Sequence, residues 1–323
     1  MAAQFASPST GLLFHILRVV APDAYQLVRL RNGTVSVRSV ADAETFHPGI
    51  GPVAEAEALY VRQLDLPGRV RATAGEFVLW DVGLGAAANA LTAVRHCAGA
   101  PGDSERRRLR LVSFDHTCDA LTFALRHAAA LGYLAGLESP VAELLANRCV
   151  QFRHGGLDVE WRLELGDFPA LLAGGGRAGG APPHAILFDP HSPQKNPAMW
   201  TVSLFTNLHR HLDPQRPCAL ATFTRSTLAR AAMLLGGFFV GVGHASGLKA
   251  ETTVAANRLE LLTEPLDRRW LERAARSDSA EPLVEPVYRR AKLGAATAAR
   301  LREQPQFRAQ LAPETAVLGK NAV

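Results

Sequence analysis

Four carboxylates close apolar segments of this chain: Asp81 after FVLW, Asp115 after LRLVSF, Asp167 after LELG, and Asp189 after AILF. A carboxylate can accept hydrogen bonds from a ribose, an adenine amino group or an amine. Each aspartate alone is more often a helix cap or a turn residue. If the segments are parallel strands, however, their carboxyl ends meet at the edge where α/β proteins bind ligands. The pattern therefore predicts one ligand site built from strand ends.

A short glycine loop follows the first of these strands. Gly83 and Gly85 lie between FVLWD and an Ala-rich helical segment, and lack of side chains lets their backbone approach a ligand closely. The helix start then points free N–H groups and a positive dipole end at the same place. This arrangement predicts a nucleotide-type ligand.

Two cofactors fit such a loop. The permissive dinucleotide fingerprint, Gly-x-Gly-x-x-Gly/Ala, is met by Gly83, Gly85 and Ala88. The pyrophosphate of a dinucleotide, however, would be repelled by the carboxylate of Asp81. The ammonium of S-adenosyl-L-methionine would instead be attracted by that carboxylate. Asp115 is placed for ribose hydroxyls, which both cofactors share, and Asp167 for an adenine amino group. The loop therefore favours the sulfonium cofactor.

The segments that must position these residues alternate between strands and helices. This rhythm runs from FVLWD to ETTVAANR and predicts a doubly wound, Rossmann-like α/β sheet, because parallel strands need helical crossovers. FFVGVG and ETTVAANR predict a closing antiparallel pair. Upstream, alternation around Asn32-Gly33 predicts a β-hairpin extension. We expect three parts: a hairpin and helix extension over 1–62, the main domain over 63–263, and a helical, partly flexible tail over 264–323.

Bulk properties limit the remaining possibilities. The 323 residues carry a formal net charge of +5, which suits a polyanionic partner but also a solvated Arg-rich surface. The four cysteines form no Cys-x-x-Cys pair, so neither a zinc ribbon nor a disulfide framework is indicated. His209 and His211 do not share a helix face, and we expect no metal. Without a signal peptide or an apolar span of transmembrane length, we expect a cytoplasmic protein with no membrane partner.

Several motifs together resemble the MnmC-like methyltransferase family, the class I methyltransferases that form 5-methylaminomethyl-2-thiouridine in tRNA. The specific one is Asp-Pro-His-Ser-Pro-Gln-Lys-Asn-Pro-Ala-Met-Trp over 189–200. The family's acid-x-Gly-x-Gly stretch corresponds to 81–89, its segment before a glutamate-led helix to Phe46-His47-Pro48, and its late Gly-x-Gly-x-Lys-x-Glu region to the stretch ending in Lys249 and Glu251. The likeness covers roughly residues 26–277. Departures are Ala86 and Ala87 in the cofactor loop and His191 in the specific motif.

The resemblance implies a fold, an activity and a set of site residues. It implies an S-adenosyl-L-methionine-dependent N-methyltransferase that acts on the primary amine of 5-aminomethyl-(2-thio)uridine at the tRNA wobble position. A separate enzyme would then supply the aminomethyl precursor. The residues expected at the cofactor are Asp81, Gly83, Gly85, Asn89, Asp115, Asp167 and Glu55. Those expected at the substrate or tRNA are His191, Ser192, Lys195, Arg225 and Lys249, where the three cations are candidates for phosphate contacts.

Asp189 is the candidate catalytic residue. It could hold the N–H groups of a substrate amine and aim the nitrogen lone pair, while Pro190 and Pro193 stiffen the loop. The competing role is a helix cap. We expect Asn196 to be the cap, with Pro197 at the first helical position, which leaves Asp189 for chemistry.

Three alternatives remain open from the sequence. The acceptor could be a small-molecule or peptide amine. The protein could be a dinucleotide-dependent oxidoreductase. It could also be a non-catalytic relative, since Ala87 adds a methyl group where the backbone of the cofactor loop needs freedom.

Overall fold

The computed structural model describes residues 24–99, 106–174, 178–247 and 249–308. Its centre is an eight-stranded sheet in the order β10-β11-β9-β8-β4-β5-β7-β6. The strands are β4 (Glu76–Val82), β5 (Arg107–Asp115), β6 (Cys149–His154), β7 (Leu157–Leu165), β8 (Ala185–Phe188), β9 (Ala219–Thr222), β10 (Phe239–Gly243) and β11 (Thr252–Ala256). Five central strands run parallel, whereas β6, β10 and β11 pair antiparallel with their neighbours. The predicted α/β sheet with its antiparallel closing pair is confirmed.

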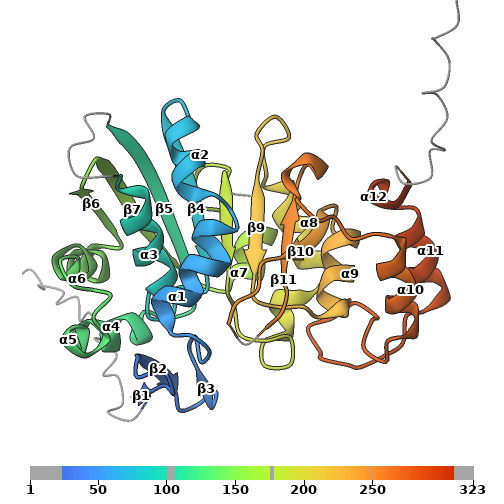
Figure 1. Cartoon of the computed structure of the whole chain (residues 1–323), viewed down its shortest axis with the longest axis horizontal. Helices are drawn as coiled ribbons and strands as arrows, with labels where there is room; N and C mark the ends of the chain where they lie inside the picture. The colour runs from blue at the N-terminus through green and yellow to red at the C-terminus, as the bar shows by residue number, and fades with distance from the viewer. Residues whose placement is uncertain (1–23, 100–105, 175–177, 248, 309–323) are drawn as a thin grey trace, which may run out of the picture.

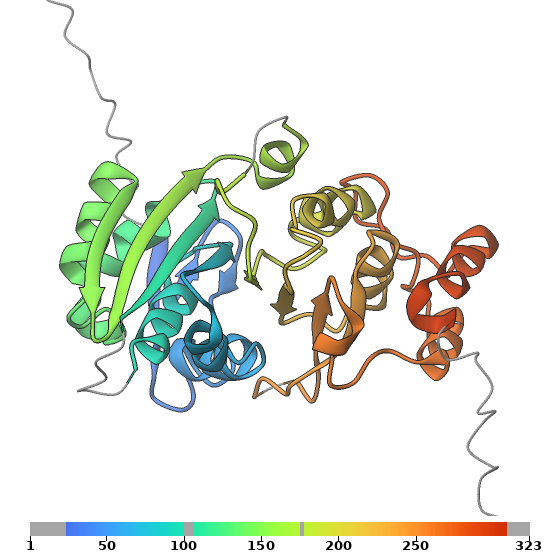
Figure 2. The ribbon, with the colours of Figure 1, turned by 90° about the horizontal axis from the view of Figure 1, so that it is seen from above.

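Helices cover both faces of the sheet (Figures 1 and 2). One face carries α1 (Pro52–Ala56), the π-helix η1 (Glu57–Arg62), α2 (Leu66–Ala72), α3 (Ala88–Cys97), α4 (Asp119–Arg126), α5 (Ala128–Leu131) and α6 (Glu138–Asn147). The other carries α7 (Phe168–Ala173), the 3₁₀ helix η2 (Pro197–Trp200), α8 (Val202–Arg210), α9 (Thr227–Leu235), α10 (Arg268–Arg276), α11 (Ala295–Arg302) and α12 (Pro305–Arg308). A short 3₁₀ turn, η3 (Leu259–Leu261), follows β11.

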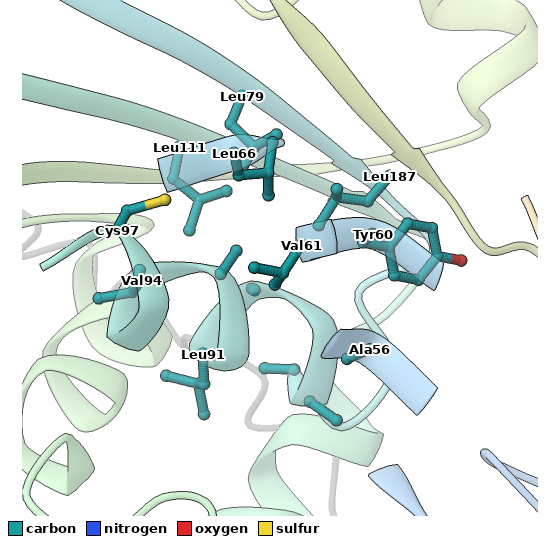
Figure 3. Packing of buried hydrophobic residues seen from close by; sticks show 14 of the residues in the cluster. Ala56, Tyr60, Val61, Leu66, Leu79, Leu91, Val94, Cys97, Leu111 and Leu187 are labelled. Carbon is teal, nitrogen blue, oxygen red and sulfur yellow. The ribbon is translucent and has the colours of Figure 1, made fainter. Parts of the chain in front are cut away.

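The sheet is buried from both sides, which explains why its strands have continuous apolar runs. Side chains alternate along β4: Phe77 and Leu79 join the core on the α3 face, and Trp80 joins the core on the α8 face. Figure 3 shows the first of these cores, where Leu79, Leu111 and Leu187 from three strands meet side chains of η1, α2 and α3.

The predicted N-terminal hairpin is also confirmed. β1 (Tyr25–Arg29) pairs with β2 (Val35–Ser39), and a two-residue strand, β3 (Glu44–Thr45), adds to β2. Gly33 takes a φ of 84° in the turn, as expected for Asn-Gly. This small sheet lies below the strand ends of the main sheet in Figure 1.

The sequence pattern predicts one continuous helix over 118–134 and another over 197–212, and both are interrupted in the structure. The first, over CDALTFALRHAAALGYL, is broken into α4 and α5 near His127. In addition, strand β6, which the sequence pattern does not predict, pairs antiparallel with β7 at the edge of the sheet. The helix expected from Pro197 to Leu212 is interrupted at Thr201. Thr201 has extended backbone angles, and its hydroxyl accepts a hydrogen bond from the Leu204 N–H, so it caps α8.

The described part of the C-terminal segment packs against the sheet. The side chain of the buried Gln306 accepts a hydrogen bond from the Val240 N–H and donates to the Val240 carbonyl, so it pairs with the edge of β10. Trp270 and Phe307 stack beside it. The predicted boundaries at 62/63 and 263/264 stay predictions, and the frayed end expected beyond residue 308 lies outside the described residues. No helix of the described part is long and apolar enough to cross a membrane.

Candidate active site

A cavity of about 780 Å³ lies at the carboxyl ends of β4, β5 and β8. Its walls come from the glycine loop after β4, the turn after β5, the residues around β3 and the segment that follows β8. We call residues 189–200 the reaction loop. The cavity volume is within the range of small-molecule and cofactor sites.

The glycine loop fits tightly against the reaction loop. Gly83 has a φ of 91°, and a Cβ there would lie 2.6 Å from the carbonyl oxygen of Asp189. Only glycine satisfies both the positive φ and this close approach. Gly85 also has a positive φ, 51°, and a Cβ there would face the ring of Phe46 at 3.3 Å.

Asp115 supports this loop from β5. Its Oδ2 accepts a hydrogen bond of 2.9 Å from the Gly85 N–H, and its Oδ1 accepts one of 2.7 Å from the His116 N–H. Burial raises the pKa of its carboxyl group, while these backbone donors oppose the rise. Each oxygen keeps a further lone pair, so Asp115 can still accept from a ribose hydroxyl in the cavity that it lines.

Ala87 occupies the left-handed region, with a φ of 62° and a ψ of 18°. The resemblance places glycine at this position. The conformation is thus retained although the glycine is not, and the methyl group is completely buried. A left-handed alanine costs about 1 kcal/mol or more relative to a right-handed one, and such strain often lies beside functional sites.

Asp81 is completely buried and does not line the cavity. Its Oδ2 accepts a hydrogen bond of 2.8 Å from Ser113, whose oxygen in turn accepts one from the Trp161 indole. Its Oδ1 has no partner among the described residues. Burial raises the pKa of this carboxyl group to about 7.

Two further predicted site residues, like Asp81, do not reach the cavity. Asp167 caps α7 by accepting a hydrogen bond from the Ala170 N–H, and its side chain is half exposed. Gly166 and Phe168, its neighbours, line the cavity instead. Arg225 is exposed and is likewise not part of the wall. The predicted contacts of Asp167 with adenine and of Arg225 with a phosphate therefore stay predictions, which the positions of these side chains do not support.

Asp189 lies in the cavity wall at the end of β8. Asn89 donates a hydrogen bond of 2.7 Å to its Oδ2. Burial raises the pKa of the Asp189 carboxyl group, and His47 and Asn89 oppose this rise. Asn89 was predicted to contact the cofactor; in the structure its amide nitrogen is bound to the candidate catalytic carboxylate.

His47 and Tyr60 surround Asp189, and neither was predicted as a site residue. His47 has a φ of 50°, and its Nδ1 lies 3.8 Å from Oε1 of Glu55. Burial lowers the pKa of His47, but Glu55 and Asp189 outweigh it, so the net pKa is raised. The sequence offers His47 only as part of the Phe46-His47-Pro48 motif, and Tyr60 lies in an apolar helical run that gives no signal of function.

Tyr60 is fully buried in the π-helix η1, and its hydroxyl makes no hydrogen bond of normal geometry with the described residues. In Figure 3 the hydroxyl points away from the apolar cluster. Burial raises the pKa of Tyr60, and the negative charge of Asp189 adds to the effect. Its donor is therefore available to the Asp189 carboxylate.

His191 joins the reaction loop to the N-terminal hairpin. Its Nδ1 lies 2.6 Å from Oε2 of Glu44, its Nε2 lies 3.6 Å from Asp42, and Ser192 is 3.4 Å from the same glutamate. The Trp200 indole donates to the His191 carbonyl and closes the loop. Asn196 is the N-cap residue of η2 and Pro197 is its first residue, as expected, but the Asn196 side chain makes no capping hydrogen bond.

Lys249 and Lys195, which were expected at the substrate, also line the cavity. The Lys249 ammonium donates to the Phe223 carbonyl at 3.0 Å and lies 4.3 Å from the centre of the Phe223 ring. Burial lowers its pKa, and the carboxylates of Glu55 and Asp189 oppose the change. Lys195 is exposed at the rim. No group of three or more His, Cys, Asp or Glu side chains in the described ranges could hold a metal.

The donor set fits S-adenosyl-L-methionine. Gly83 and Gly85 bring backbone rather than side chains to the cavity wall, and Asp115 lines the same wall with acceptor capacity left for a ribose. The cavity then continues past these groups to Asp189 and Lys249.

Comparisons with known proteins agree with this geometry. Residues 140–258 match the model of a family described as S-adenosyl-L-methionine-dependent methyltransferase. The tRNA 5-methylaminomethyl-2-thiouridine biosynthesis bifunctional protein MnmC of Aeromonas hydrophila is 29% identical over 231 residues, which are 69% of this chain and 34% of that protein. The MnmC of Ectopseudomonas mendocina is 35% identical over 117 residues, 36% of this chain and 17% of that protein. The chain thus spans about a third or less of the length of these relatives.

The solved structure of MnmC2 from Aquifex aeolicus shares the fold, with a TM-score of 0.61 and 19% identity over 81% of this chain and 79% of that one. The matched family uses the sulfonium cofactor, so the dinucleotide alternative is not supported. Over residues 140–258 the chain thus matches an S-adenosyl-L-methionine-dependent methyltransferase family, and the likeness to MnmC2 shows a shared fold.

Proposed function

We propose that the protein methylates the primary amine of 5-aminomethyl-uridine, or of its 2-thio form, at the wobble position of tRNA. The similar bifunctional proteins are named for tRNA 5-methylaminomethyl-2-thiouridine biosynthesis. The match to their methyltransferase region makes this amine the first acceptor to test.

The observation that carries the proposal is the contact between the glycine loop and Asp189. Gly83 lies so close to the Asp189 backbone that a methyl group on its Cα would collide with the Asp189 carbonyl oxygen. A cofactor held by the glycine loop and an amine held by the Asp189 carboxylate would therefore share one cavity. That proximity is the main requirement for a direct group transfer.

The chemistry needs a neutral amine. When bound, the cofactor supplies an electrophilic methyl group on a sulfonium. An alkylammonium has a pKa near that of lysine, about 10, and has no free lone pair until it loses a proton. Asp189 is placed to accept an N–H hydrogen bond and to take that proton, and burial makes its carboxylate a stronger base than usual. The nitrogen lone pair then forms the new N–C bond while the S–C bond breaks.

The neighbours of Asp189 have defined tasks in this proposal. Asn89 holds one carboxylate oxygen, so the other is left for the amine. His47 and Glu55 are the next titratable groups and can pass the proton outward. Lys249 and Lys195 are candidates for a nucleotide phosphate next to the acceptor.

The decisive experiment is mass spectrometry of tRNA nucleosides. tRNA that carries the unmethylated aminomethyl group is incubated with the protein and S-adenosyl-L-methionine, then digested. A mass increase of one methyl group on that nucleoside supports the proposal. If the cofactor binds but only a small-molecule or peptide amine is methylated, the tRNA function is refuted.

A further inference from the structure

A surface segment over 283–290 lies directly beside the reaction loop. Leu283 forms a parallel bridge with Thr201, and its carbonyl accepts a 2.9 Å hydrogen bond from the Val202 N–H. Thr201 follows Trp200, the last residue of the reaction loop. The connection from α10 to α11, which contains this segment, runs along the lower part of Figure 1, where the N-terminal hairpin also lies.

The segment exposes an unusual set of side chains. Val284 is 75% exposed and Val287 is 48% exposed, although large apolar side chains are normally covered. Glu285 between the two valines is also exposed, and the exposed Arg289 and Arg290 follow after the partly buried Tyr288. Within the part of the chain that the structure describes, no ion pair involves either arginine.

The charge of the chain is divided unequally along its length. Residues 1–188 carry 17 Lys and Arg against 18 Asp and Glu, whereas residues 189–308 carry 17 against 11. The half that contains the reaction loop and the 283–290 segment is therefore the positive half. Such an asymmetry favours a polyanionic partner on this side of the protein.

We propose that the 283–290 segment is an RNA-contact strip, which binds the nucleotides next to the one being methylated. Arg289 and Arg290 would contact backbone phosphates, and Val284 and Val287 would contact exposed faces of unstacked bases. Single-stranded RNA is held by cationic contacts to its backbone and by bases that pack on protein side chains, most often aromatic rings or arginine guanidinium groups. The inference rests on the proposed tRNA function and adds to it a surface outside the cavity.

The test compares the full-length protein with the double variant R289A/R290A. Its matched control is R71A/R106A, which removes two exposed arginines near the starts of β4 and β5, at the opposite edge of the sheet. Binding of unmethylated tRNA is measured by fluorescence anisotropy at several salt concentrations. Methylation is measured with the same tRNA and with the free nucleoside 5-aminomethyl-2-thiouridine.

We expect R289A/R290A to bind tRNA roughly tenfold more weakly, since two exposed phosphate contacts are lost. The slope of log affinity against log salt should fall in magnitude by about 1.4. Turnover of the free nucleoside and kcat at saturating tRNA should stay unchanged, and R71A/R106A should behave as wild type.

Two outcomes overturn the inference in distinguishable ways. If the wild-type protein methylates tRNA and R289A/R290A binds tRNA with the same affinity and salt dependence as the wild type, residues 283–290 do not contact the RNA, and the proposed function stands. If the wild-type protein neither binds nor methylates tRNA, both proposals fall together.

Discussion

The Asn89 amide nitrogen lies 2.7 Å from Oδ2 of Asp189, and this hydrogen bond joins the first turn of α3 to the end of β8. The helix that follows the glycine loop thus holds the candidate catalytic carboxylate directly. Because the bond stabilises the ionised form of Asp189, it opposes the increase in pKa that burial causes. Cofactor loop and proton acceptor are therefore parts of one rigid arrangement.

Replacing Asp189 should separate binding from chemistry. Asp189→Asn keeps the size of the side chain and an oxygen for the Asn89 amide, but it loses the charge and the ability to take a proton. We expect turnover to fall by about 100-fold or more, while S-adenosylhomocysteine affinity changes by less than about threefold. Single-turnover methylation and calorimetry measure the two quantities. A rate near that of wild type would show that another group accepts the proton.

Gly83 should tolerate no side chain. Gly83→Ala places a methyl group 2.6 Å from a backbone carbonyl at a φ of 91°. Gly75→Ala is the matched control, because Gly75 has the same φ of 91° and no atom within 4 Å of the added Cβ. The control should lose about 1 kcal/mol of unfolding free energy from backbone strain alone. Gly83→Ala should lose clearly more, together with cofactor affinity, in urea titrations and calorimetry. Equal losses in the two variants would contradict the close approach.

Asp81 should make stability fall as the pH rises. Its carboxyl group has a pKa of 3.8 in a model compound and about 7 in the folded protein, because it is buried. Between these values the folded state binds more protons than the unfolded state, so the stability that Asp81 contributes is present at low pH and is lost as the pH rises through 7. Relative to Asp81→Asn, the apo wild-type protein should lose on the order of 2 kcal/mol between pH 5.5 and 8.

Urea unfolding at several pH values between 5.5 and 8 measures this difference. Comparing the two proteins removes the contributions of Asp115 and Asp189, whose raised pKa values have the same sign. If the free energies of unfolding of the wild type and Asp81→Asn changed in parallel with pH, folding would not raise the pKa of Asp81, and the inference from its complete burial would be wrong.

The fold and the location of the site could be predicted because they follow from chain periodicity. Parallel strands must end at one edge, so acids that close consecutive strands converge whatever their side-chain directions. What sequence patterns do not contain is where each side chain points. Asp167 follows a strand like Asp115, but it is the first residue before α7 and its carboxylate turns to that helix. The contact of His191 with Glu44 joins residues 147 positions apart and had no local signal.

That contact leads to a prediction about the hairpin. His191 and Glu44 are each about one-third exposed, and their 2.6 Å hydrogen bond is the closest link between the reaction loop and β3. The reaction loop is already tied to α8 through Trp200, so the link should mainly order the hairpin over the cavity.

A double-mutant cycle with His191→Ala, Glu44→Ala and the double variant should give a coupling free energy of about 0.5–1 kcal/mol that declines with added salt. The single variants should exchange backbone hydrogens faster at residues 42–47 and raise the KM for the acceptor more than they lower kcat, since Asp189 and Asn89 are untouched. A coupling energy of zero, with unchanged exchange, would mean that the hairpin is held by its other contacts, such as the packing of Tyr25 against Phe123.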